Sequence, residues 1–217
     1  IIADMESNGI KVKKDNLLNL SENFSEQLEK LQEKIFLCSS SEFNINSTKQ
    51  LGEIIFDKLK IPGAKKNKSG SFSTNSEVLE TLAEQGYEIA SLVLSWREIS
   101  KLKNTYTESL TNNISNKTNR VHTTIQMTGA QTGRFSSTDP NLQNIPIKSK
   151  NGKEIRKAFV SEKGYKLVCF DYSQIELRLL AEIAQIEKLR KAFSKGLDIH
   201  KLTASQIFNV EVSKVHN

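Results

Sequence analysis

Cysteine, proline and tryptophan are scarce in this chain of 217 residues, which holds two cysteines, three prolines and one tryptophan. Cys38 and Cys169 lie far apart in the sequence, and no cluster of histidines accompanies them, which argues against a zinc site. Cys169 lies in an apolar segment, where we expect a small buried side chain, and this cysteine usage fits a reducing compartment. The sequence has no apolar run of about 18 residues and no signal-like start, so we expect neither a membrane span nor secretion.

The composition is that of an ordinary soluble protein with a basic balance. Hydrophobic residues make up 37% of the chain and charged residues 26%, and the length allows one or two domains with a sizeable core. The net charge of +6 and the pI near 9.2 favour a polyanionic partner, although many ordinary proteins are as basic. The chain does not begin with Met and both ends interrupt patterned sequence, so we expect a fragment of a longer protein.

Two long amphipathic helices are predicted in the first half of the chain. The first has Asp15 as its N-cap and an apolar stripe at helical spacing. The residues of this stripe are Leu17, Leu20, Phe24, Leu28, Leu31 and Ile35. The second runs from about Tyr87 to Asn113, with apolar residues at Ile89, Leu92, Trp96, Ile99, Leu102, Tyr106 and Leu110. Two such helices, packed antiparallel, predict an extended arm rather than a compact domain.

The end of this arm is predicted to carry short helices and a basic loop. Ser47 with Gln50, and Thr74 with Glu77, each match a capping box that starts a helix. Between them lies a loop with Lys65, Lys66 and Lys68, and the polar face of the second long helix adds Arg97, Lys101 and Lys103. The loop has two open interpretations: a solvated connection, or a cationic segment that follows a phosphate backbone without reading bases.

The second half of the chain adds strands, so the predicted fold class is α+β. Val121, Thr123, Ile125 and Met127 alternate as in a strand, and the apolar run 165–170 predicts a buried one. Three helices are expected to follow. They run from just after Asp171 to about Ile186, from Lys188 to Phe193 with an end at Gly196, and from the opening residues 198–200 through Phe208.

Asp171 is the most informative acidic residue. It lies at the end of the predicted strand 165–170, where its carboxylate can leave the sheet and ligate a hard cation. Taken alone, an Asp in this place is more often the N-cap of the following helix. The wider sequence decides between the two interpretations.

Two long motifs together resemble the palm of family A DNA polymerases, the DNA polymerase I type. Residues 132–146 read TGRFSSTDPNLQNIP and residues 170–179 read FDYSQIELRL, in the order and at a separation that fit this family. The stretch from Trp96 to Tyr106 resembles the thumb of the same family. The resemblance implies an incomplete right-hand polymerase fold. Its parts would be a palm-proximal lead-in (1–13), a helical thumb (14–114), a partial palm (115–172) and the start of the fingers (173–217).

This resemblance implies template-directed DNA synthesis by two-metal nucleotidyl transfer in the whole protein, with the fragment alone inactive. Asp171 would be the catalytic metal ligand, with the backbone carbonyl of Tyr172 as a further ligand and two Mg²⁺ ions in the complete enzyme. Glu176 would close the space beneath the sugar and exclude a 2′-hydroxyl group, instead of being an exposed helical Glu paired with a cation. The second metal carboxylate of the family belongs to a later hairpin and has no match in this sequence.

Four polar residues of the 132–146 motif can donate hydrogen bonds: Arg134, Asn141, Gln143 and Asn144. Because purine N3 and pyrimidine O2 lie at nearly equivalent places in every correct pair, donors in the minor groove can test pair geometry without reading sequence. The alternative is an ordinary polar turn between Pro140 and Pro146.

The nucleotide-binding residues implied by the resemblance are Ser173, Gln174, Ile175, Glu176 and His200, the last as a contact to the incoming triphosphate beside a helix N-terminus. The expected partners are primer-template DNA and deoxynucleoside triphosphates, with no membrane. We expect a monomer in the cytoplasm, either the bacterial cytoplasm or nucleoid or an organelle. An alternative from another class is a non-catalytic module that binds duplex DNA.

Overall fold

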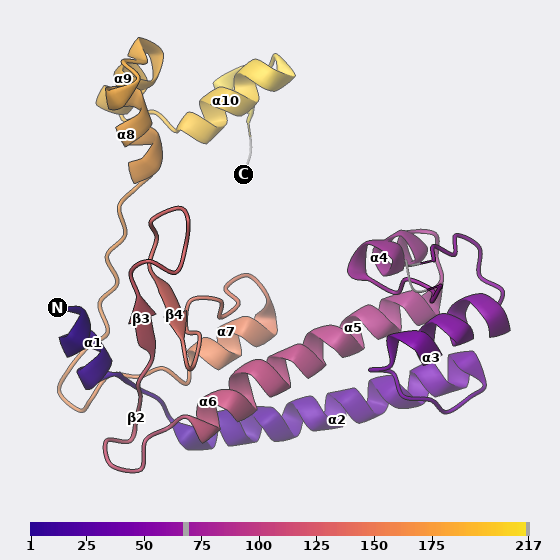
Figure 1. Ribbon diagram of the computed structural model, residues 1–217. Coiled ribbons are helices and arrows are strands. Elements are labelled where there is room, and N and C mark those ends of the chain that lie inside the picture. The colour runs from indigo at the N-terminus through magenta and orange to yellow at the C-terminus, as the bar shows by residue number, and fades with distance from the viewer. Residues whose placement is uncertain (67–69, 216–217) are drawn as a thin grey trace. The chain divides into compact units, whose positions relative to one another are not determined.

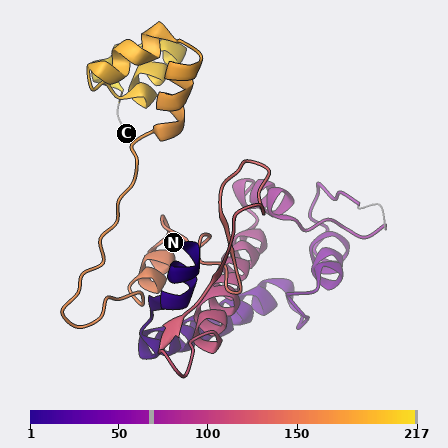
Figure 2. The same ribbon diagram turned by 60° about the vertical axis from the view of Figure 1, so that its left-hand side comes forward.

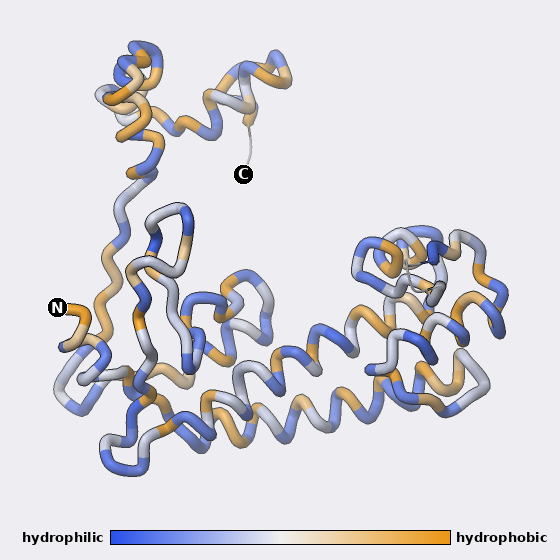
Figure 3. The backbone as a smooth tube through the Cα atoms, viewed as in Figure 1, coloured by the Kyte–Doolittle hydropathy of each residue, from blue (hydrophilic) through white to orange (hydrophobic). Residues whose placement is uncertain are grey.

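The apolar stripe from Leu17 to Ile35 forms one face of α2 (Lys14–Ser39) in the computed structural model. This 26-residue helix lies antiparallel beside α5 (Glu88–Leu102), as Figures 1 and 2 both show. Apolar residues recur among polar ones along both helices (Figure 3), because one face of each is buried against the other. The predicted arm is therefore confirmed. The N-cap of α2 is Lys13, not Asp15, which lies in the first helical turn.

The structure describes residues 1–66 and 70–215, and the chain divides into two compact units, Ile1–Lys166 and Leu167–Asn217. The other elements of the first unit are α1 (Ile2–Asn8), β1 (Ile10–Lys11), α3 (Thr48–Gly52), η1 (Glu53–Lys58), α4 (Ser76–Glu84), η2 (Lys103–Glu108), α6 (Ser109–Asn112), β2 (Arg120–Val121), β3 (Thr124–Gln126), β4 (Ser136–Thr138) and α7 (Lys150–Arg156). Those of the second unit are α8 (Ile175–Ile183), α9 (Glu187–Ser194), α10 (Ile199–Phe208) and the 3₁₀ turn η3 (Val212–Lys214).

The second long helix contains a π-helical turn that the sequence pattern did not predict. α5 continues without a break through η2, which is a π helix, into α6. Leu102, Tyr106 and Leu110 are spaced by four residues, and each such step in an α-helix advances the side chain about 40° past a full turn. The wider π turn offsets this drift, so all three side chains stay buried on one side.

One end of the arm is closed by α3, η1 and α4, which bury Leu51, Ile55, Val78 and Leu79 against the long helices. The capping box at Ser47 is confirmed in part: its hydroxyl accepts a hydrogen bond from the Gln50 amide, while the Gln50 side chain bonds the Asn44 amide.

The predicted capping box at Thr74 is wrong, because Asn75 caps α4 by accepting from the Val78 amide. Thr74 is instead buried, and its carbonyl and hydroxyl oxygens both accept hydrogen bonds from Arg97. Burial lowers the pKa of the Arg97 guanidinium. Arg97, predicted on the polar face of the arm, therefore ties α5 to the segment before α4.

The other end of the arm packs against α7 and the first of two small antiparallel sheets. β1 pairs with β2, so that Ile10 lies opposite Val121. β3 pairs with β4, so that Ile125 lies opposite Ser137. A second core cluster joins this region to the arm; it contains Val12, Leu17, Phe24, Ile99, Leu102, Tyr106, Leu110, Val121, Ile145, Ile155 and Ala158. The mixed helical and antiparallel architecture confirms the predicted α+β class.

The second unit is a set of short helices with little burial. α8, α9 and α10 bury only Ala181, Ala192 and Ile199 among the apolar residues that the structure describes there. The third predicted helix ends at Phe208, and Asp198 caps its start with a carboxylate that accepts from the amides of His200 and Lys201. Over the described residues, no helix of either unit has the length and apolar character needed to cross a bilayer.

The segment 165–170 is not a buried strand, and this prediction was wrong. Its residues are exposed and extended; Phe170 is 94% exposed and Cys169 is exposed as well. A strand forms only where a neighbour satisfies its backbone hydrogen bonds. No described strand of this chain pairs with it.

Candidate functional site

The loop 141–146, which we call the amide loop, has two different faces. Leu142 and Ile145 point into the second core cluster, and Ile145 is only 8% exposed. Asn141 precedes Leu142, Gln143 and Asn144 lie between Leu142 and Ile145, and all three amide residues are exposed. The alternation of apolar and amide side chains thus turns three hydrogen-bonding groups outward from a buried anchor.

The start of the amide loop is held by a compact hydroxyl network. The Thr123 hydroxyl lies 2.6 Å from the Ser137 hydroxyl and donates to the Pro140 carbonyl at 2.8 Å. The Leu142 amide donates to the Ser137 hydroxyl at 3.0 Å. Ser137 is 4% exposed, so these bonds satisfy groups that burial would otherwise leave unpaired.

The far end of the amide loop is held by close packing with α7. A Cβ atom at Gly152 would lie 2.6 Å from the Pro146 carbonyl oxygen, closer than any side chain tolerates. Only glycine therefore allows the first turn of α7 to approach the loop this closely.

Some of the amides already have local partners. The side-chain oxygen of Asn141 accepts from the Gln143 backbone amide at 2.9 Å, and the Gln143 side-chain nitrogen donates to the Phe135 backbone carbonyl at 3.1 Å. The Gln143 amide retains a second hydrogen, since an NH₂ group has two donors. Arg134 is exposed in the same segment and has an interaction within the chain.

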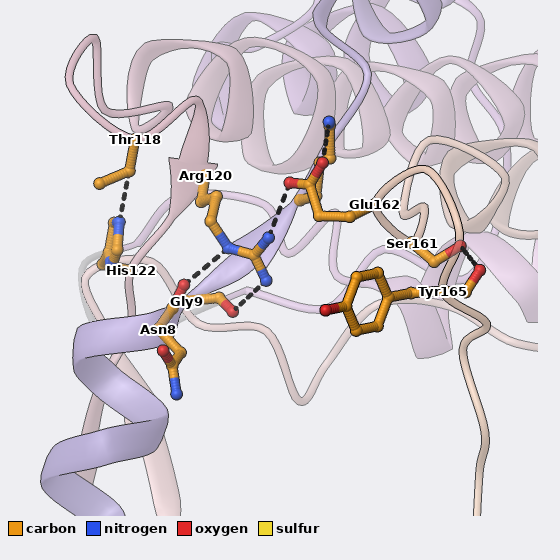
Figure 4. Close-up of polar contacts among 9 residues, drawn as sticks. Asn8, Gly9, Thr118, Arg120, His122, Ser161, Glu162 and Tyr165 are labelled. Atoms are coloured by element: carbon orange, nitrogen blue, oxygen red, sulfur yellow. Dashed lines mark hydrogen bonds and ion pairs between the residues drawn. The ribbon is translucent and has the colours of Figure 1, made fainter.

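Glu162 anchors the chain shortly before the segment that leads to Asp171 (Figure 4). Its two carboxylate oxygens accept from the Lys11 ammonium at 2.5 Å and from the Arg120 guanidinium at 3.0 Å. Arg120 also donates to the carbonyl oxygens of Asn8 at 2.7 Å and Gly9 at 3.1 Å. The hydrogen bond from Lys11 and the two positive charges lower the pKa of the Glu162 carboxyl. Residues far apart in the sequence thus meet here, and no local sequence pattern predicted this contact.

Asp171 is exposed, and its surroundings differ from the prediction. It lies in the extended segment after 165–170 and not at the end of a strand. The alternative of an N-cap is wrong too, because α8 begins at Ile175 and Gln174 holds the N-cap position. The Asp171 carboxylate is therefore not committed to capping the helix. Glu176 is the second residue of α8, exposed in its first turn, and has an interaction within the chain.

Arg178 stabilises the turn between Asp171 and α8. Its Nε donates to the Ser173 carbonyl at 2.9 Å, and its guanidinium carbon lies 4.4 Å from the centre of the Phe193 ring in α9. The cation–π contact joins the two helices. Gln174, which lies between Ser173 and Arg178 in the chain, adopts a left-handed backbone conformation with φ of 53°.

His200 is exposed in the first turn of α10. The prediction counted on helix amides that would attract a phosphate beside it. Asp198 already accepts from the amides of His200 at 2.9 Å and Lys201 at 3.2 Å. These two amides are therefore already occupied, while the His200 side chain stays exposed.

The predicted DNA-binding lysines differ in their surroundings. Lys65, Lys66 and Lys101 are exposed. The Lys65 ammonium is 3.9 Å from a Glu77 oxygen, and the Lys66 ammonium lies 5.4 Å from the centre of the Phe72 ring. The Lys103 ammonium is 2.8 Å from a Glu108 oxygen. Lys68 lies outside the described residues.

The described residues offer an incomplete set of metal ligands. No three His, Cys, Asp or Glu side chains of residues 1–66 and 70–215 are gathered closely enough to hold a metal ion. Asp171 supplies one carboxylate, the kind of oxygen ligand that Mg²⁺ prefers. The donor chemistry at Asp171 fits the expected ion, while the number of ligands does not complete a site.

The chain matches known proteins over nearly its whole length. The family model described as DNA polymerase family A matches residues 14–217. The chain is 45% identical to a DNA polymerase I of Rhizobium leguminosarum over 98% of its length, and 46% identical to that of Bacillus subtilis over 99%. These stretches cover 21% and 24% of the relatives, so the chain spans less than a quarter of their length.

A solved structure gives the same picture of the fold. The POL domain of Pol1 from M. smegmatis, in complex with a DNA primer-template and dNTP, superposes with a TM-score of 0.88 at 38% identity. The match covers 99% of this chain and 38% of the solved one.

Proposed function

The chain belongs to DNA polymerase family A, and on this premise we propose that the protein containing it extends DNA primers by template-directed transfer of deoxynucleotides. In this proposal, 1–13 leads into the palm, 14–114 is the thumb, 115–172 is part of the palm and 173–217 begins the fingers. Its substrates are primer-template DNA and deoxynucleoside triphosphates, which the similar M. smegmatis domain holds in its complex. A monomeric state and a cytoplasmic location stay predictions.

The observation that carries the proposal is the amide loop. Its backbone is fixed at both ends while Asn141, Gln143 and Asn144 face outward. Amide donors held on a rigid frame suit the minor groove, where every correct pair offers acceptors at similar positions. Such contacts test the shape of the primer–template pair without reading its sequence, as a copying enzyme needs.

Asp171 is the catalytic residue of the proposed reaction. Enzymes of this family are generally metal-dependent. We assign the Asp171 carboxylate, with the carbonyl oxygen of Tyr172, as ligands of Mg²⁺, of which the complete enzyme would hold two ions. When bound, the metal supplies charge neutralisation at the attacking and leaving oxygens of phosphoryl transfer. The exposure of Asp171 and its freedom from helix capping support this assignment.

The test is primer extension by the full-length protein with Mg²⁺. Asp171→Ala should abolish incorporation and leave the affinity for primer-template largely intact, because the change removes a metal ligand and no contact to DNA. Asp57→Ala, at an exposed residue of η1, is the matched control and should extend normally. Extension by Asp171→Ala at the wild-type rate would refute the catalytic assignment. Loss of DNA binding instead would make the residue structural.

Glu176 is proposed as the residue that excludes ribonucleotides, beside Ser173, Gln174 and Ile175 in the nucleotide-binding segment. Its place in the first turn of α8, five residues after Asp171, supports this role. Rejection by crowding discriminates strongly without any contact to the base. Glu176→Ala should therefore raise the use of ribonucleotides relative to deoxynucleotides. Unchanged sugar selection in competition assays would remove this assignment.

A second candidate applies to the 217-residue chain taken alone: a non-catalytic module that binds duplex DNA. The exposed Lys65, Lys66 and Lys101 on the arm, together with the net charge of +6, favour it. Binding through phosphates releases counterions, so the affinity for a duplex should fall steeply as salt rises. Lys65→Ala combined with Lys66→Ala should flatten that slope by about two units. A slope unaffected by both changes would exclude the basic loop from binding.

A further inference from the structure

A buried tyrosine of the arm holds the backbone of the amide loop. The hydroxyl of Tyr106 donates to the carbonyl oxygen of Asn144 at 2.5 Å. Tyr106 is 3% exposed, and burial raises the pKa of its phenol, so the hydroxyl keeps its proton at neutral pH. The bond joins residues 38 positions apart in the chain.

This bond lies at Asn144, the second of the two adjacent exposed amide residues Gln143 and Asn144. Leu142 and Ile145 anchor the loop by their side chains, and the Leu142 amide is fixed by Ser137. Between these anchors, the Asn144 carbonyl accepts the bond from the buried Tyr106 hydroxyl. The Tyr106 hydroxyl therefore sets how far the loop stands from the arm at the position where Gln143 and Asn144 turn outward.

Tyr106 reaches the loop because of the π-helical turn η2. The turn lies between α5 and α6, and its wider winding keeps Tyr106 and Leu110 on the buried side. π turns often occur at functional positions in helices. The same continuous helix also forms half of the arm that carries the exposed Lys101. One continuous helix thus carries both Lys101, a candidate DNA contact, and Tyr106, which holds the amide loop.

We propose that Tyr106 is a positioning residue, which through the Asn144 carbonyl holds the amide loop where its side chains can test the primer–template pair. The inference rests on the proposed function. It assigns Tyr106 no contact with the substrate: the residue acts through the loop. Its hydroxyl affects how strictly a mispaired primer end is rejected, more than how fast a matched end is extended.

The test uses the full-length protein and compares kcat/KM for matched and mispaired primer ends. Tyr106→Phe keeps the ring in the core and removes only the hydroxyl. We expect it to lower the matched-to-mispaired ratio by about threefold to tenfold, the effect of one lost hydrogen bond. Thr107→Val is the matched control, because Thr107 is fully buried in the same turn and its hydroxyl donates to Lys103 within the helix. This control should leave the ratio unchanged.

A combined variant checks that Tyr106 acts through the loop. In a background of Gln143→Ala and Asn144→Ala, the two outward amides next to the Tyr106 bond are gone, and Tyr106→Phe should then have little further effect on the ratio. An unchanged ratio in Tyr106→Phe alone, or an equal loss in Thr107→Val, would overturn the inference and leave a merely structural tyrosine. A wild-type protein that extends neither primer end would refute the proposed function, and the inference with it.

Discussion

The arm and the second unit bury their apolar residues very differently. In the arm, Leu17, Phe24 and Ile35 are fully buried along α2, and two core clusters cover the facing side of α5. In the second unit, Leu179 is 52% and Ile183 80% exposed although both lie on the apolar face of α8. The comparison teaches that the first unit contains its own core. The segment with Asp171 is held instead by local bonds such as the one from Arg178 to Ser173.

The largest expected effect tests where the folding energy lies. Phe24→Ala removes the fully buried ring that α2 contributes to the second core cluster. It should lower the free energy of unfolding by about 3–5 kcal/mol. Leu180→Ala in α8, at a side chain 49% exposed, should cost less than about 1 kcal/mol. Urea unfolding followed by the fluorescence of Trp96, the one tryptophan of the chain, measures the first unit directly. Equal losses of unfolding free energy in Phe24→Ala and Leu180→Ala would contradict the difference in burial between the two units.

A smaller effect is expected from removing one helix cap in each unit. Asn75 caps α4 and Asp198 caps α10, and replacing such a cap by Ala costs about 1 kcal/mol. Asn75→Ala should lower the urea midpoint seen by Trp96, because α4 belongs to the same core cluster. Asp198→Ala should leave that midpoint unchanged and speed amide hydrogen exchange within α10. Asn75→Asp, which keeps a capping oxygen, should restore the midpoint. A shift of the Trp96 midpoint by Asp198→Ala would mean that the units unfold together.

The arm could be predicted from the sequence because its information is local. The stripe of α2 repeats at helical spacing, and one face of such a helix must find cover wherever it lies. The same local reasoning went wrong at 165–170, where an apolar run has strand character but a strand depends on a neighbour that no local pattern supplies. Local reasoning also missed the π turn of η2, because apolar residues spaced by four fit an ordinary α-helix almost as well as a π turn.

In the candidate site, too, local features could be predicted from the sequence and long-range contacts could not. The motifs singled out Asp171 and the amides in 141–144, all of which are exposed in the structure. The motifs did not reveal the groups that hold these residues in place, because Tyr106, Glu162 and Arg120 meet partners far away in the sequence. Tyr106 carried a weak signal, as a residue with a polar tip among the apolar positions of the arm, and such a tip needs a partner when buried.

The smallest expected effect concerns the ion cluster at Glu162, the last anchor of the first unit before the exposed segment. The folded pKa of Glu162 lies below its ordinary value, mainly because Lys11 donates a hydrogen bond to it. The cluster therefore contributes stability that is fully present above the unfolded pKa of about 4.3, and that is lost as pH falls through the lower folded pKa. Glu162→Gln should reduce stability slightly at pH 7, where the carboxylate is ionised, and its stability curve should meet that of the wild type in acid. Urea midpoints measured by Trp96 fluorescence between neutral and acidic pH test this, with Glu84→Gln, at an exposed residue of α4, as the control. A difference between Glu162→Gln and wild type that stays constant through the acid range would show that the ionised carboxylate does not anchor the chain there.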